Sequence, residues 1–149
     1  MRSAWLAKVV LFALTALALG RGGSMASSRI SDCPDSPNCV SSLSRDQDHY
    51  ASPFRVDIAP DEVWAALKRV LGAEPRTRVV EEDNERWYLR AEATSRLFRF
   101  VDDVEFQLIP EEHLMHVRSA SRVGYWDLGV NRRRVERLRE ALKREGLWR

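Results

Sequence analysis

Three consecutive stretches of the chain alternate hydrophobic with polar residues at a period of two. They span residues 86–94, 98–108 and 113–123, and only short polar or proline-containing segments separate them. Such alternation predicts strands with one buried and one solvated face, and connections this short join antiparallel neighbours. The centre of the chain is therefore expected to fold as an antiparallel sheet.

Weaker patterns on both sides of these stretches complete the predicted fold. Further strands are expected at 54–58 and 76–81, and helices at 60–72 and 132–145. Pro60 suits the first position of one helix, and Asn131 is the expected N-cap of the other. The order β-α-β-β-β-β-α predicts an α+β fold, in which an antiparallel sheet of about five strands carries two helices on one face. A TATA-binding-protein-like or helix-grip-like arrangement would fit this order.

The hairpin between the last two strands predicts a definite register. If residues 109–112 form its loop, Leu108 faces His113 and Asp102 faces Ser119. The hydrophobic residues of the hairpin then share one face, and a slip by one residue would bury its charged residues instead. Asp102 is therefore expected on the buried face of the sheet.

The solvated face of the same hairpin carries alternating charges. Asp103 and Glu105 are two residues apart and share this face with Arg118 and Arg122, among others. Two carboxylates at this spacing can serve a glycoside hydrolase, but arginines on the neighbouring strand favour a ladder of cross-strand ion pairs. The ion-pair ladder is the preferred interpretation.

The first 26 residues differ from the rest of the chain. They contain three basic residues and no acidic one, and residues 9–19 form an unbroken apolar run. This pattern is typical of a secretory signal peptide, and an uncleaved N-terminal anchor is the alternative. Both predict an exported protein, either periplasmic or membrane-anchored and facing away from the cytosol. Residues 27–52 are interpreted as a linker and a cysteine loop, and residues 53–149 as a single α+β domain.

The charge of the remaining chain is unevenly distributed. Residues 27–130 carry 13 basic and 19 acidic side chains, whereas residues 131–149 carry eight basic and three acidic ones. A nucleic-acid-binding protein usually presents a basic domain or stripe. Here the basic C-terminal segment complements an acidic body, so we expect no nucleic-acid partner.

Cys33 and Cys39 enclose the turn-rich segment CPDSPNC. Its prolines and asparagine can bring the two sulfurs together, and in an exported protein such a pair forms a disulfide by default. Redox chemistry would normally use a C-x-x-C pair, and metal binding would need further ligands nearby. A structural disulfide is the preferred interpretation, with a redox or metal role as the alternative.

Longer blocks of the sequence resemble a known family. These blocks are CPDSPNCVSS at 33–42, FRFVDDVEF at 98–106 and VRSASRVGYWDLGVNRRRVERLREAL at 117–142. Together they resemble the bacterial and plastid family called domain of unknown function 1499, from about residue 33 to residue 142. The resemblance implies an exported or membrane-attached protein. It assigns no activity and carries over no catalytic residue.

Asp102 is the residue of greatest chemical interest, because a buried carboxylate requires partners. Three arginines in the first turn of the last helix could supply them. Two interpretations remain open: a buried clamp between Asp102 and Arg132, Arg133 and Arg134, or an anion-binding site at the helix N-terminus. The residues of the candidate binding site are Asp102, Ser119, Ser121, Tyr125, Asp127, Asn131, Arg132 and Arg133.

No nucleophile, metal or cofactor motif stands out in the sequence, so we expect no cofactor and no metal. The preferred function is a small exported or envelope-associated domain that binds without catalysis. Its expected partner is an envelope or membrane component, with a small anion as a candidate ligand. The alternative is a hydrolase that acts on an anionic substrate around Asp102. A deep pocket enclosing Asp102 would favour the enzyme, and a filled core would favour the binding domain.

Overall fold

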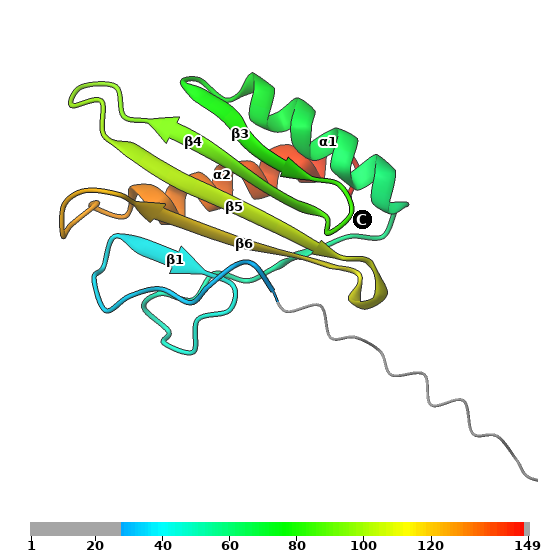
Figure 1. Ribbon diagram of the computed structural model, residues 1–149, viewed down its shortest axis with the longest axis horizontal. Coiled ribbons are helices and arrows are strands. Elements are labelled where there is room, and N and C mark those ends of the chain that lie inside the picture. Colours follow the sequence, from blue (N-terminus) through cyan, green and yellow to red (C-terminus); the bar gives the residue numbers. More distant parts are fainter. Residues whose placement is uncertain (1–27, 148–149) are drawn as a thin grey trace, which may run out of the picture.

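A computed structural model describes residues 28–147, which form one sheet with two helices (Figure 1). The elements are β1 (Cys39–Ser41), β2 (Phe54–Arg55), α1 (Pro60–Ala73), β3 (Thr77–Asp83), β4 (Tyr88–Thr94), β5 (Val101–Ile109), the 3-10 helix η1 (Pro110–Glu112), β6 (Leu114–Ser121) and α2 (Val130–Arg144). The predicted signal or anchor at 1–26 lies outside the described residues.

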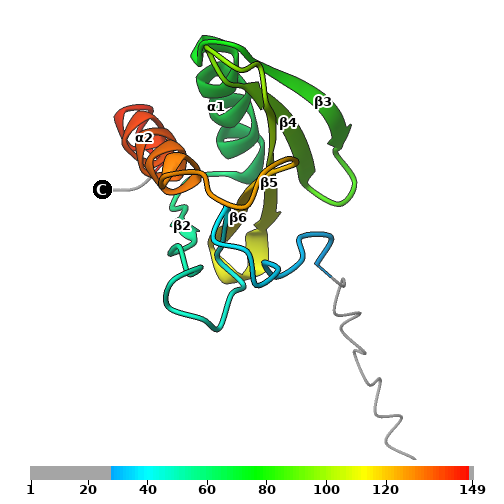
Figure 2. The ribbon, with the colours of Figure 1, turned by 90° about the vertical axis from the view of Figure 1, so that its left-hand side faces the viewer.

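The sheet has six strands in the order β1-β6-β5-β4-β3, and the short β2 also pairs with β6. The paired strands run antiparallel. Both helices lie on the same face of the sheet and pack against each other (Figure 2). The predicted α+β class is confirmed. The sheet has one strand more than expected, because β1 is a fully buried strand of three residues with no alternation to reveal it.

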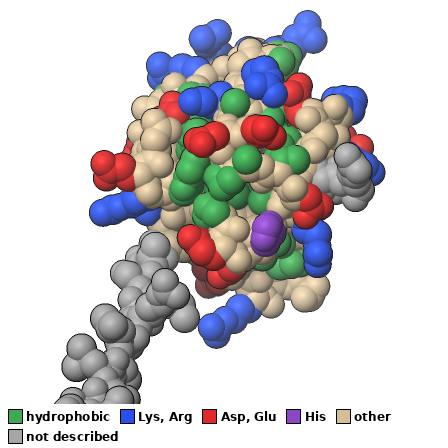
Figure 3. Space-filling view, turned by 90° about the vertical axis from the view of Figure 1, so that its right-hand side faces the viewer, with side chains coloured by type: hydrophobic (Ala, Val, Ile, Leu, Met, Phe, Trp, Pro, Cys, Tyr) green, Lys and Arg blue, Asp and Glu red, His purple; other side chains and the backbone are tan. Residues whose placement is uncertain are grey.

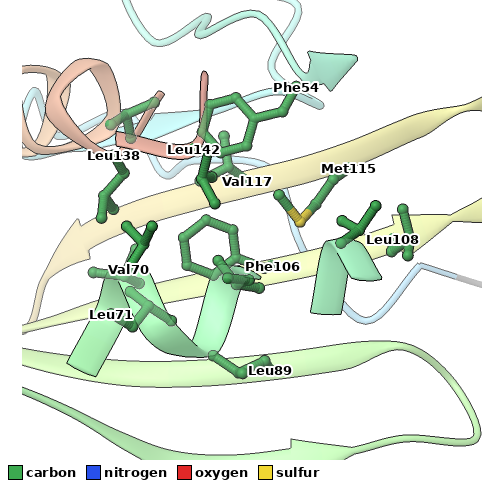
Figure 4. Packing of buried hydrophobic residues seen from close by; sticks show 14 of the residues in the cluster. Phe54, Val70, Leu71, Leu89, Phe106, Leu108, Met115, Val117, Leu138 and Leu142 are labelled. Atoms are coloured by element: carbon green, nitrogen blue, oxygen red, sulfur yellow. The ribbon is translucent and has the colours of Figure 1, made fainter. Parts of the chain in front are cut away.

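The core lies between the sheet and the helices (Figure 4). Its largest residues include side chains from four strands and both helices, and the following are fully buried: Phe54, Leu89, Phe106, Met115, Leu71 and Leu138. This packing follows from the alternation of β4, β5 and β6, since their inward residues are the hydrophobic ones. No specific fold family is assigned by these features, so the TATA-binding-protein-like or helix-grip-like arrangement stays a prediction.

The predicted register of the β5–β6 hairpin is wrong by two residues. Leu108 pairs with Met115 rather than with His113, and Asp102 pairs with Ser121 rather than with Ser119. The loop keeps its expected length but lies one residue further along the chain, at 110–113, because β5 continues through Ile109 and pairs it with Leu114. The 3-10 turn η1 and the left-handed backbone of His113, with φ 54°, form this loop. A shift of two residues keeps each side chain on its predicted face, so Asp102 is still buried.

Two predicted boundaries next to this hairpin are also wrong. Residues 98–100 were expected to begin β5, but the strand begins at Val101 and residues 96–100 form an exposed loop. Helix α2 begins at Val130 rather than at 132, and Asn131 lies inside it instead of capping it. Gly129 occupies the cap position, with a φ of 75° that favours glycine.

Within residues 28–147 no helix is long and apolar enough to cross a membrane. The segment before β2 adds the edge strand β1 to the sheet, and Ile30 is buried. Residues 28–52 are therefore closely attached to the helix-and-sheet unit.

Candidate functional site

The carboxylate of Asp102 is buried where β5 passes beneath the start of α2. Only 4% of the residue is exposed, and Arg134 Nη2 donates a hydrogen bond to its Oδ2 at 2.5 Å. Arg134 Nη1 donates to Ser119 Oγ at 3.0 Å and to Asn131 Oδ1 at 2.7 Å. The buried carboxylate thus has a buried guanidinium as its partner, which offsets the cost of burying each group. This geometry favours the clamp, and Arg134 is the arginine that makes it.

Asn131 connects the clamp to the loop that precedes α2. Its Nδ2 donates to the backbone oxygen of Asn38 at 2.9 Å, to Ser121 Oγ at 3.0 Å and to Asp127 Oδ2 at 2.9 Å. Its Oδ1 accepts from Ser119 Oγ at 2.6 Å. We call this group, formed by Asp102, Ser119, Ser121, Asp127, Asn131, Arg134 and Asn38, the inner network. Buried polar groups satisfied in this way hold neighbouring segments in a single arrangement.

Asp127 supplies the negative charge at the N-terminus of α2. Its carboxylate accepts from the backbone N–H of Gly129 at 2.8 Å and from that of Asn131 at 2.9 Å. These are the donors with which a helix N-terminus holds an anion. A small anion at this place would therefore compete with a carboxylate of the chain itself.

The remaining arginines predicted for the site contact backbone instead of Asp102. Arg132 donates to the carbonyl oxygens of Tyr50 and Asp48 at 2.8 and 2.7 Å, and Arg133 donates to that of Leu128 at 2.9 Å. The structure thus brings together five of the eight predicted site residues, namely Asp102, Ser119, Ser121, Asp127 and Asn131. It places Tyr125, Arg132 and Arg133 outside the inner network.

The cysteine loop supports the same region from the other side. Cys33 and Cys39 form a disulfide, and Asn38 beside it is buried. Asn38 Nδ2 donates to Gly124 O at 2.5 Å, while its backbone oxygen accepts from Ser121 N at 3.0 Å. This role of Asn38 was not predicted. The only sequence signal for it was an asparagine next to Cys39, which had been read as a turn residue.

Two loops at the end of the sheet next to the inner network expose hydrophobic side chains. Residues 96–100 join β4 to β5, and residues 122–128 join β6 to α2. Both loops leave the sheet at one end, because Thr94 pairs with Val101 and Asp102 pairs with Ser121 (Figures 1 and 2). Seven large hydrophobic residues of these loops are between 47% and 80% exposed: Leu97, Phe98, Phe100, Val123, Tyr125, Trp126 and Leu128. We call these seven residues the apolar tip.

The aromatic residues of the apolar tip contact one another in pairs. The rings of Phe98 and Phe100 are stacked with centroids 5.5 Å apart, and those of Tyr125 and Trp126 meet edge to face at 6.3 Å. Large hydrophobic side chains gathered at an exposed place are characteristic of interaction surfaces. The prediction from sequence missed this surface, because residues 98–100 had been assigned to a strand whose Phe100 faced the core.

The opposite face of the sheet carries the predicted ion-pair ladder. Asp103 accepts from Arg90 at 3.0 Å and from Arg122 at 2.7 Å, while Glu105 accepts from Arg118 at 2.7 Å. The hydrogen bond from Arg122, opposed by burial, holds the pKa of Asp103 below its usual value. Both carboxylates are engaged by arginines, as expected for a ladder.

One polar pair on this side was not predicted. Ser42 Oγ lies 3.0 Å from His116 Nδ1, and burial lowers the pKa of this imidazole. Ser42 Oγ also accepts from Val117 N at 3.0 Å. The serine oxygen is thus held by the backbone amide of Val117, and His116 contacts Ser42.

Two hollows in the surface lie near the candidate site, since Arg132 and Arg133 line one of them and Val101 lines the other. One runs along α2 and is lined by charged residues such as Arg137 and Glu140; the other lies beside Arg78 and Glu92. Asp102 lines neither of them, and neither is lined by any residue of the apolar tip. In the described part of the chain, no group of three or more His, Cys, Asp or Glu residues is placed to hold a metal ion.

The sequence matches one protein family along most of its length. The model of the family described as "Protein of unknown function (DUF1499)" covers residues 29–142. This range includes the cysteine loop, every strand and most of α2, and with them the inner network and the apolar tip. No curated protein matches the chain.

Proposed function

The chain belongs to the DUF1499 family, and from this premise we propose that it is an exported, non-catalytic binding domain that docks onto a component of the cell envelope through its apolar tip. The observation that carries the proposal is the exposure of seven large hydrophobic side chains at one end of the sheet. Burying a side chain of this size against a partner is strongly favourable, whereas leaving it in water contributes nothing to folding.

Hydrogen bonds to the rest of the domain restrain the second loop of the tip, as is favourable for a binding surface. Gly124 accepts from the Asn38 side chain, and Asp127 caps α2 within the same loop. A loop held at both ends loses less conformational freedom on binding than a free one, which favours association. The inner network is then the scaffold of the site rather than its reactive centre.

Export is supported by two features of the chain. The disulfide between Cys33 and Cys39 is of a kind that persists in oxidising compartments outside the cytosol. Residues 1–26 have the charge and apolar pattern of a signal peptide or anchor. Together they favour a periplasmic or membrane-anchored domain.

The alternative, hydrolysis of an anionic substrate around Asp102, has less support. The carboxylate is buried against Arg134, and Asp127 is engaged with backbone amides. Tyr125, another residue of the candidate binding site, is 62% exposed on the tip. These three residues do not converge on a space that a substrate could enter.

Site-specific photo-crosslinking in the cells that make the protein tests the proposal. A photoreactive phenylalanine analogue replaces Phe98 in the tip or, as a control, Val79, an exposed hydrophobic residue of β3. Docking predicts covalent adducts with an envelope component from position 98 and not from position 79. Absence of adducts from position 98, or equal adducts from both positions, would overturn the proposed function.

A further inference from the structure

We infer that the envelope component on which the apolar tip docks is the anionic surface of a lipid bilayer, an inference that rests on the tip being the docking surface proposed above. The residue types of the tip are those found at a membrane surface. Trp126, Tyr125 and two phenylalanines stand beside exposed leucines. Tryptophan and tyrosine concentrate at the boundary between lipid and water, where one part of the ring is buried and the polar atom stays hydrated.

Arginines alternate with the hydrophobic residues of the first loop, in the order Arg96, Leu97, Phe98, Arg99, Phe100. Both arginines are exposed, and neither has an ion-pair partner among residues 28–147. By contrast, Arg122 in the other loop is neutralised by Asp103 and Glu92. Two free positive charges set among apolar side chains match the anionic headgroups that lie above the acyl chains of a bilayer.

The tip loops, residues 96–100 and 122–128, carry a single negative charge, that of Asp127. Its two carboxylate oxygens accept hydrogen bonds from the amides of Gly129 and Asn131. An anionic surface therefore meets two unpaired positive charges and one negative charge at the tip, and the positive end of the α2 dipole partly offsets the negative one.

The shape of the tip also suits a bilayer. Its two loops lie at one end of the sheet (Figure 2). Its seven hydrophobic residues are exposed and line neither of the two hollows described above. A projecting apolar surface can enter the interfacial layer of a bilayer, which adapts to its shape. A protein partner would instead have to supply a surface complementary in shape, and a stable interface would have to extend beyond the tip itself.

The opposite end of the sheet has a turn of the opposite charge, which would help to orient the molecule on a charged membrane. Its β5–β6 turn contains Glu111 and Glu112, both exposed, and no basic residue. Figure 3 looks onto this end and shows acidic and basic side chains around a patch of hydrophobic ones. A negatively charged membrane attracts the tip and repels this end, within the range that salt screening allows.

Vesicle binding by the full chain tests the inference. Because residues 1–26 are present in every variant, contact is read locally, as quenching of Trp126 fluorescence by brominated lipids; subtracting the signal of Trp126→Phe isolates this tryptophan. Vesicles of phosphatidylcholine with about one-third phosphatidylglycerol should quench Trp126, and vesicles of phosphatidylcholine alone should quench it several-fold less at equal lipid concentration.

Two matched pairs of variants locate the contact. Leu97→Ser combined with Phe98→Ser should weaken binding to the anionic vesicles by about tenfold or more, whereas Val79→Ser should leave it unchanged. Arg96→Gln combined with Arg99→Gln should weaken it by about tenfold and reduce its salt dependence, whereas Arg86→Gln at the opposite end should not. All these residues are exposed, and thermal midpoints equal to that of the wild type verify folding.

Three outcomes overturn the lipid inference: no quenching of Trp126 by anionic vesicles, equal quenching by neutral ones, or tip variants that bind as the wild type does. Crosslinks from position 98 to a protein, without vesicle binding, would leave the proposed function standing and identify the partner as a protein. Failure of both the crosslinks and the vesicles would remove the docking function itself.

Discussion

At one end of the sheet the chain turns through the β3–β4 and β5–β6 connections, and at the other it turns through the two loops of the apolar tip. Hydrophobic residues near the first end, such as Ile58 and Trp87, are partly buried and pack against the core. Those of the tip, such as Leu97 and Trp126, lie in water. The charges differ as well, since the β5–β6 turn is acidic and residues 96–100 are basic.

This difference separates the needs of folding from those of binding. Packing accounts for the hydrophobic residues at the turn end, but nothing in the core requires those of the tip. The tip is nevertheless fixed from below, by the inner network and by Asn38 of the cysteine loop. The inner network therefore stabilises the fold, and the exposed residues of the apolar tip are left for recognition.

The largest expected effect concerns the support of the tip. Asp102→Asn leaves Arg134 buried without its counter-charge, which typically costs about 3 to 5 kcal/mol of unfolding free energy. Asp103→Asn is the matched control: it is the next residue on the opposite face, where Arg90 and Arg122 remain partly exposed, and should cost about 1 kcal/mol or less. Denaturant titration measures both, and equal small losses would contradict a buried clamp.

The disulfide should contribute the next largest effect. Replacing Cys33 and Cys39 together by serine removes a short covalent ring and should cost about 2 kcal/mol without changing the fold. Because Asn38 lies beside Cys39 and binds Gly124, amide hydrogen exchange in residues 122–128 should accelerate, while exchange in 110–113 should stay as it was. Equal acceleration at both ends would show that the disulfide stabilises the fold without specifically supporting the tip.

Acid should weaken the outer ladder by a smaller amount. The pKa of Asp103 is lowered in the folded protein, mainly by the hydrogen bond from Arg122, so its contribution to stability is present above the ordinary value of 3.8. That contribution is lost as the pH falls through the lowered folded value, and we expect about 1 kcal/mol or less. Comparing denaturation midpoints of the wild type and Asp103→Asn between neutral and acid pH isolates it. A difference that grows as the pH falls would have the wrong sign.

The smallest expected effect is on the tip itself. Leu97→Ser should change the free energy of unfolding by less than about 0.5 kcal/mol, because the side chain is already exposed. Ile58→Ser at the turn end should cost about 1 kcal/mol or more, because Ile58 packs against the core. Thermal melts compare the two. A larger loss for Leu97→Ser than for Ile58→Ser would mean that the tip serves packing rather than binding.

The period-two alternation allowed the sheet, its faces and the ion-pair ladder to be predicted, since each depends only on which residues share a face. The register of β5 and β6 was wrong because β5 continues through Ile109, so that the turn falls at 110–113 and ends on His113, a left-handed residue that no pattern marks. Burial of Asp102 was predicted correctly. The choice of Arg134 among three adjacent arginines depends on where α2 begins, and the prediction placed that start two residues too late.

The apolar tip was missed for a different reason. Alternation of Phe98 and Phe100 with arginines suits a half-buried strand as well as an exposed loop, and only the start of β5 at Val101 distinguishes them. The role of Asn38 depends on contacts with residues far along the chain, Gly124 and Asn131. Contacts of this kind leave no local periodicity to read.

Amide hydrogen exchange of the full chain, with and without vesicles containing phosphatidylglycerol, tests the central claim most directly. If the tip docks on an anionic bilayer, vesicles should slow exchange in residues 96–100 and 122–128 and leave residues 110–113 at the opposite end unchanged. Unchanged exchange in both tip loops, or slowing centred on residues 110–113, would contradict the account.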